Sequence, residues 1–99
     1  MPAELINYTV VLAVPIVPTA AGQAALADLQ EELDARPHLD RPLVTWDSEK
    51  ERLVVTVAVE DATPEAAATN MAEELWEIAA AVLPDFQTMR VEIVSVDGT

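Results

Sequence analysis

The sequence predicts an α+β fold in which a four-stranded antiparallel sheet carries two helices on one face. Along the 99 residues the hydrophobic pattern has the period of a strand, a helix, two strands, a helix and a strand. A charged turn at Glu49-Lys50 joins the two middle strands into a hairpin. Because no Pro/Gly/Ser-rich linker divides this β-α-β-β-α-β order, we expect a single domain over residues 1–99.

The first strand covers residues 5–14, where two sets of side chains alternate. One set is Ile6, Tyr8, Val10, Leu12 and Val14, and the other is Asn7, Thr9, Val11 and Ala13. We expect the first set to face the helices and the second set to face away. The prolines at 15 and 18 then end the strand.

The first helix is expected between a capping Thr19 and Pro37. Its apolar seam is Gly22, Ala25, Leu26, Leu29 and Leu33. Gly22 on this seam favours a close approach of the helix to the sheet, and a turn that contacts a ligand is the alternative.

The middle strands have one register that satisfies both charge and hydrophobicity. It places Asp47 opposite Arg52, while Trp46 lies opposite Leu53 and Val44 opposite Val55. We therefore expect Trp46 to face the helices and to be largely buried. The first and third strands are the most continuously apolar, so they should be central, in the order 4-1-3-2.

The second helix is expected to begin at Thr63-Pro64-Glu65, which combines a capping side chain, a proline at the first helical position and an early negative charge. It carries two apolar stripes, Met71-Leu75-Ile78-Val82 and Ala68-Ala72-Trp76-Ala79-Leu83. The first helix, a partner or a ligand could cover the second stripe. Pro84 ends the helix, and a fourth strand is expected over residues 88–94, with Met89, Val91 and Ile93 facing the helices.

The sheet face without helices should be small and weakly polar, which is typical of surfaces that partners cover. We expect a homodimer through this face, with Thr9, Val11, Ala13, Val54, Thr56 and Ala58 in the interface. Arg90 should be the cation in the middle of the face. There it would pair with Glu92 or Glu60, or it would hold an anionic ligand.

Composition excludes several classes of function. Eighteen acidic and five basic residues give a net charge of −13, which disfavours nucleic acid and membrane partners. The acidity indicates a solvated surface, with docking of a basic partner as the alternative. No cysteine is present, and the single His38, followed by Asp40, lies in a proline-flanked loop. We expect a cytoplasmic protein with no metal, cofactor or catalytic residue.

The whole chain resembles the ferredoxin-like superfold, especially the dimeric α/β-barrel branch, in which two such sheets pack face to face. Cofactor-independent monooxygenases of that branch use an asparagine on the first strand and a tryptophan on the second helix, and Asn7 and Trp76 match these in kind and element. The histidine that follows in those enzymes is missing here. The chain is also loosely similar, around Gly22, to the glycine turn of ACT domains.

These patterns favour a non-catalytic homodimeric domain that acts in assembly or binds a small ligand. The alternative is a small cofactor-independent enzyme, monooxygenase-like or isomerase-like, with a pocket near Trp76, Trp46 and Tyr8. The residues that we expect to contact a small-molecule ligand are Trp76, Arg90, Asn7 and Tyr8.

Overall fold

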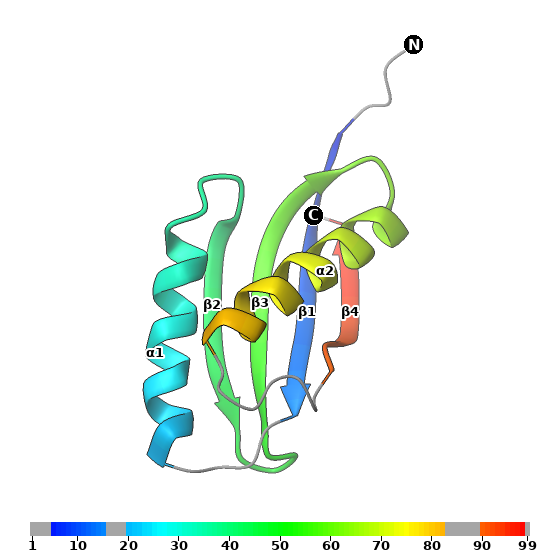
Figure 1. Cartoon of the computed structure of the whole chain (residues 1–99). Helices are drawn as coiled ribbons and strands as arrows, with labels where there is room; N and C mark the ends of the chain where they lie inside the picture. Colours follow the sequence, from blue (N-terminus) through cyan, green and yellow to red (C-terminus); the bar gives the residue numbers. More distant parts are fainter. Residues whose placement is uncertain (1–4, 16–19, 83–89, 99) are drawn as a thin grey trace.

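A computed structural model describes residues 5–15, 20–82 and 90–98 of the chain. Its elements follow the order β1 (Ile6–Pro15), α1 (Ala20–Asp34), β2 (Asp40–Asp47), β3 (Arg52–Asp61), α2 (Pro64–Val82) and β4 (Glu92–Gly98). Figure 1 shows α2 crossing the sheet, while α1 runs alongside β2. The described residues therefore form an α+β fold of four antiparallel strands and two helices.

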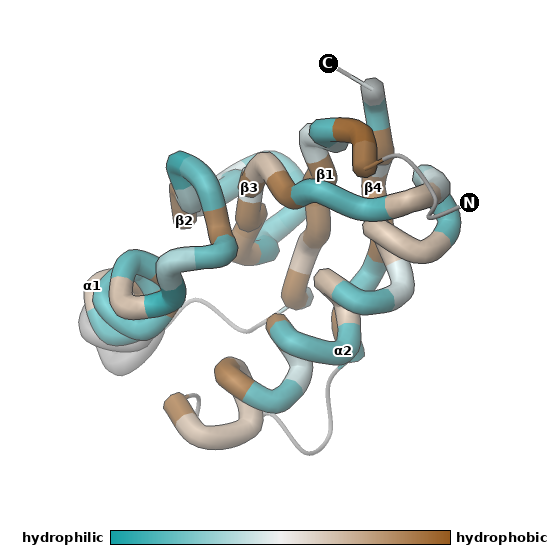
Figure 2. The backbone as a smooth tube through the Cα atoms, turned by 90° about the horizontal axis from the view of Figure 1, so that it is seen from above, coloured by the Kyte–Doolittle hydropathy of each residue, from teal (hydrophilic) through white to brown (hydrophobic). Residues whose placement is uncertain are grey.

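The strands form one sheet in the order β2-β3-β1-β4, which reads 4-1-3-2 from the opposite edge. All three neighbouring pairs are antiparallel. Figure 2, which looks at the molecule from above, shows both helices on the same side of the sheet. The other side of the sheet, which we call the helix-free face, carries no element of the described chain.

The β2–β3 hairpin has the register predicted from charge and hydrophobicity. Asp47 pairs with Arg52 and Trp46 pairs with Leu53. Trp46 packs against the core as predicted, but it is only partly buried, because β2 is an edge strand. The connection between the strands ends at Glu51, whose φ of 51° lies in the left-handed region.

The core fills the space between the sheet and the helices. The sheet supplies the helix-facing side chains of β1 and β3, all at most 1% exposed: Val10, Leu12, Val14, Leu53, Val55 and Val57. Leu29 and Leu33 of α1 are fully buried, and Met71, Leu75 and Ile78 of α2 are buried with them. The first apolar stripe of the second helix is thus part of the core, as is typical of an amphipathic helix.

Helix α2 begins as the sequence predicts. The backbone N–H of Ala66 donates to the Thr63 hydroxyl at 3.1 Å, and the Ala67 N–H donates to the Thr63 carbonyl at 3.0 Å. The first bond satisfies a donor that a helix leaves unpaired at its start, and the second is the first intrahelical bond of α2. The predicted cap Thr19 and the predicted stop at Pro84 lie outside the described residues. Gly22 lies within α1, but the structure does not describe its surroundings.

The fourth strand differs from the prediction over residues 88–94. It runs from Glu92 to Gly98, and its register against β1 shifts because Val94 falls between the residues paired with Val11 and Leu12. One extra residue reverses the alternation of side chains beyond it. Val96, opposite Val10, consequently packs on the core. Ile93 lies opposite Leu12, on the expected helix-facing side, but it is 49% exposed on this edge strand. Met89 lies outside the described residues.

Candidate functional site

The helix-free face is a surface of small side chains. Residues paired across antiparallel strands point to the same side of a sheet, so the register shows which residues belong to the helix-free face. Its central residues, all partly exposed, are Thr9, Val11, Val54, Thr56 and Ala58. Leu43, opposite Thr56, extends this surface onto β2 and is 54% exposed. None of these six side chains is charged, so water gains little from contact with the middle of the face.

Charged side chains of the helix-free face lie toward its ends and edges. Asp47 and Arg52 stand at one end of the β2–β3 hairpin, and Glu60 stands opposite Asn7 near the other end. On β4, Asp97 lies opposite Thr9. The face therefore has a neutral centre and a charged rim, the division that is typical of protein interfaces.

Ala13 requires a correction. It was expected in the dimer interface, but its side chain is 0% exposed although its position in β1 directs it to the helix-free face. Its partners across the strands are Val54 and Glu92, whose longer side chains flank the methyl group. A residue with no exposed area contributes none to an interface.

A hollow of about 370 Å³ lies at the β2 side of the helix-free face. Its lining residues are Asn7, Thr9, Asp40, Arg41, Thr56, Val57 and Ala58. Arg41 and Pro42 together stand opposite the single residue Val57, so β2 has a bulge here. Within the described part of the chain, Arg41 forms no side-chain hydrogen bond or ion pair. Nothing in the residue types had predicted this hollow, because the bulge contains no glycine.

A second hollow, of about 400 Å³, lies between α2 and the residues that precede β4. It brings together two of the predicted ligand residues, Trp76 and Arg90, and Ala72, Glu73, Glu77 and Val91 complete its lining. Trp76 is 49% exposed. Neither Trp46 nor Tyr8 lines this hollow, so the pocket expected around all three aromatic residues does not form there.

Arg90 was expected in the middle of the helix-free face, but it does not lie there. It precedes β4, which begins at Glu92, and it lines the hollow on the α2 side of the sheet. Its Nη2 lies 3.2 Å from Glu92 Oε1, which agrees with one of the two predicted alternatives, the ion pair. Its side chain is 81% exposed, so this pair is a weak one.

The other two predicted ligand residues lie apart from Trp76 and from each other. Tyr8 is only 6% exposed and belongs to the core. Asn7, its neighbour on β1, points to the opposite side of the sheet and lines the hollow beside Arg41. The structure therefore joins Trp76 with Arg90, and places Asn7 and Tyr8 elsewhere.

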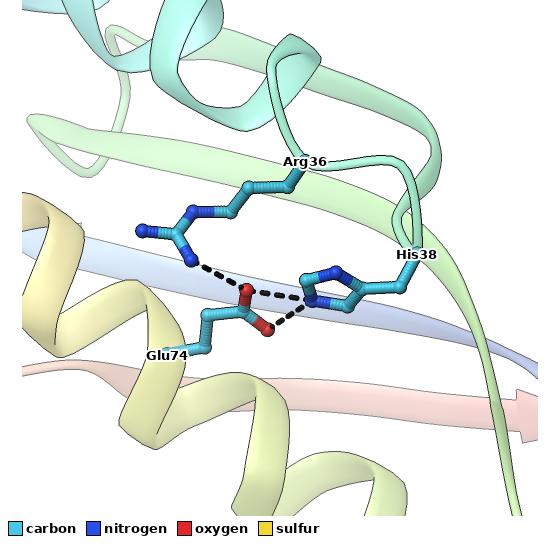
Figure 3. A network of polar contacts seen from close by, with 3 residues as sticks. All are labelled: Arg36, His38 and Glu74. Atoms are coloured by element: carbon cyan, nitrogen blue, oxygen red, sulfur yellow. Dashed lines mark hydrogen bonds and ion pairs between the residues drawn. The ribbon is translucent and has the colours of Figure 1, made fainter.

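The single histidine belongs to a polar cluster that the sequence did not predict. Figure 3 shows Arg36 and His38 converging on Glu74 of α2. His38 Nε2 lies 2.7 Å from Glu74 Oε1 and 2.9 Å from Oε2, and Arg36 donates to Oε1 at 3.1 Å. Glu74, rather than Asp40 two residues further along the chain, is the partner of His38. The cluster fixes the loop between α1 and β2 to α2.

Among the residues that the structure describes, Asp47 is the one whose pKa is clearly shifted. Burial raises its pKa, but the backbone N–H of Lys50, the Arg52 side chain and the N–H of Glu49 outweigh that effect and leave the pKa below the ordinary 3.8. The three contacts measure 3.3, 3.3 and 3.1 Å, respectively. They fix the turn of the hairpin and carry no chemistry toward either hollow.

Among the described residues, no three His, Cys, Asp or Glu side chains are grouped in a way that could hold a metal ion. No helix in the described ranges has the length and apolar character needed to cross a membrane. Comparison with known protein families and with curated proteins finds no match to this chain. The helix-free face and the two hollows are therefore the candidate functional sites of the described chain.

Proposed function

We propose that the chain is a non-catalytic homodimeric module with a ferredoxin-like fold, in which two copies pack through their helix-free faces. The antiparallel sheet with two helices is compatible with this fold. The observation that carries the proposal is the neutral centre of the face, where Val11 and Val54 remain partly exposed in the single chain. Covering such a surface removes apolar area from water.

The size of the face supports the same proposal. Four strands at a spacing of about 4.8 Å and about ten residues in length present roughly 600 Å² in projection. A stable interface takes about 800 Å² of accessible surface from each partner. Because side chains make accessible area larger than projected area, the face is of the right order. The whole chain exposes 6110 Å², so the interface would take a modest share of it.

Sedimentation velocity tests the dimer. The double variant Val11→Arg, Val54→Arg places two charges in the centre of the proposed interface and should sediment as a monomer. The control Thr69→Arg, Ala80→Arg adds the same charge at exposed positions of α2 and should sediment as wild type. A dimer that survives the first double variant, or a wild-type chain that is monomeric at micromolar concentration, contradicts the proposal.

The hollow beside Trp76 favours a second candidate, a small cofactor-independent enzyme of the dimeric α/β-barrel type. Its half-exposed indole offers a stacking surface for an aromatic substrate, and Arg90 adds a cation at the same place. A screen of quinones and aromatic acids in air, followed by absorbance, tests it. Turnover that Trp76→Ala abolishes and Thr69→Ala retains would replace the non-catalytic proposal.

We further propose a cytoplasmic location.

A further inference from the structure

Arg41 holds a backbone conformation that arginine rarely adopts. Its φ is 50°, inside the left-handed region, which non-glycine side chains disfavour. The strain arises at the bulge of β2, where glycine is the usual residue. An arginine that persists in such a position points to a use for its side chain, since strained residues concentrate at ligand sites.

The hollow that Arg41 lines combines a cation, an anion and neutral hydrogen-bonding groups. Arg41 is the only lysine or arginine among its described lining residues, and Asp40 is the only carboxylate. The structure shows no ion pair between these two side chains. Thr9 and Thr56, which carry hydroxyl groups, also line the hollow, and Ala58 adds an apolar side chain. A ligand that carries a negative and a donating group side by side complements this set.

We propose that this hollow binds a small carboxylic acid with an ammonium or hydroxyl group on the carbon next to the carboxylate. The guanidinium of Arg41 donates two parallel hydrogen bonds to the carboxylate, because its planar fork matches the two oxygens of that group. Asp40 and the threonine hydroxyls accept hydrogen bonds from the neighbouring ammonium or hydroxyl group. The volume of about 370 Å³ admits a short aliphatic side chain as well.

This site goes beyond the proposed dimer, but it shares Thr9, Thr56 and Ala58 with the centre of the helix-free face, so a partner chain would border or cover the hollow. All its lining residues belong to one chain, and neither Val11 nor Val54 is among them. The monomeric double variant Val11→Arg, Val54→Arg should therefore keep the site. Sedimentation of this variant tests the dimer, and acid binding by the same variant tests the hollow. Either proposal can therefore fail without the other.

Isothermal titration calorimetry with three acids of nearly equal shape tests the inference. Leucine carries an ammonium group, 2-hydroxy-4-methylpentanoate carries a hydroxyl, and 4-methylpentanoate carries neither. We expect at least one of the first two to bind at least tenfold more tightly than 4-methylpentanoate, since a site built for a donor rejects the analogue without one. The comparison of the first two decides between a 2-amino and a 2-hydroxy acid. Absence of binding by all three, to the wild-type chain and to the monomeric double variant alike, overturns the proposal.

Two variants of Arg41 and one control variant locate the binding at Arg41. Arg41→Gly and Arg41→Asn both suit a positive φ and remove the guanidinium, so each should weaken binding at least tenfold. Glu51→Gly changes the other positive-φ residue, away from the hollow, and should leave the affinity within twofold of wild type. If both Arg41 variants fold and bind as wild type does, the site is not at Arg41. The two replacements guard against a folding defect specific to either one.

Discussion

Asp47 and Arg52 face each other across the last pair of the β2–β3 hairpin, with Arg52 Nε 3.3 Å from Asp47 Oδ2. The other carboxylate oxygen of Asp47 accepts the backbone N–H groups of Glu49 and Lys50. One side chain thus fixes both the register of the strands and the path of the turn between them. All of these contacts favour the ionised carboxylate.

The first prediction concerns acid stability. Because the pKa of Asp47 is lowered in the folded chain, ionised Asp47 stabilises the fold at pH values above the ordinary 3.8, and this contribution is lost as the pH falls through the lower folded pKa. Asp47→Asn should therefore be less stable than wild type at neutral pH, and the difference should close below about pH 4. Urea unfolding at several pH values measures it, and a gap that widens with acid would contradict the prediction.

The second prediction concerns the turn residue Glu51. Relief of its positive φ outweighs the extra freedom that glycine gives the unfolded chain, so Glu51→Gly should raise the free energy of unfolding by about 0.5–1 kcal/mol. Glu49→Gly, two residues earlier and outside the left-handed region, should lower it by a similar amount. Chemical denaturation of both variants makes the comparison. Equal effects of the two changes would mean that the conformation of Glu51 is not strained.

The third prediction concerns the cluster around Glu74. Glu74→Gln removes the negative charge that Arg36 and His38 share, so it should cost about 1 kcal/mol of unfolding free energy. Glu73→Gln makes the same change at the adjacent exposed position and serves as the matched control. Thermal unfolding of the two variants is the measurement. If both lose the same stability, the cluster contributes nothing specific.

The fourth prediction concerns the salt dependence of the proposed dimer. Each copy carries a net charge of −13, while the centre of the proposed interface is neutral, so long-range repulsion opposes association. Raising ionic strength from about 0.01 M to about 0.5 M shortens the screening length from about 30 Å to a few ångströms. The dissociation constant should fall severalfold, as read by sedimentation equilibrium. A dimer that weakens with salt would instead depend on ion pairs.

The hairpin and the start of α2 could be predicted from the sequence because two independent signals agreed at each. At the hairpin, the charge pair Asp47–Arg52 and the apolar pair Trp46–Leu53 require the same register. At α2, the capping hydroxyl of Thr63 precedes the helix-compatible Pro64. Local chemistry decides both features, so they are visible in a short stretch of chain.

The parts that could not be predicted depend on contacts between distant segments. The register of β4 against β1 shifts at Val94, and no residue type in the sequence indicates this shift. The partner of His38 is 36 residues away in the chain, on a helix with several carboxylates that look alike in sequence. Arg41 adopts a conformation that its residue type gives no reason to expect. Each of these changes the candidate sites while leaving the fold class untouched.

Both edge strands of the sheet carry an irregularity. On β2 it is the bulge at Arg41 and Pro42, and on β4 it is the shift at Val94. A straight exposed edge invites another chain to add a strand, and bulges and prolines at edges oppose this. The sheet is thus poorly suited to grow sideways into an aggregate. Straightening either edge, for example by deleting Val94, would open a route toward fibre-like polymerisation from which the native chain is protected.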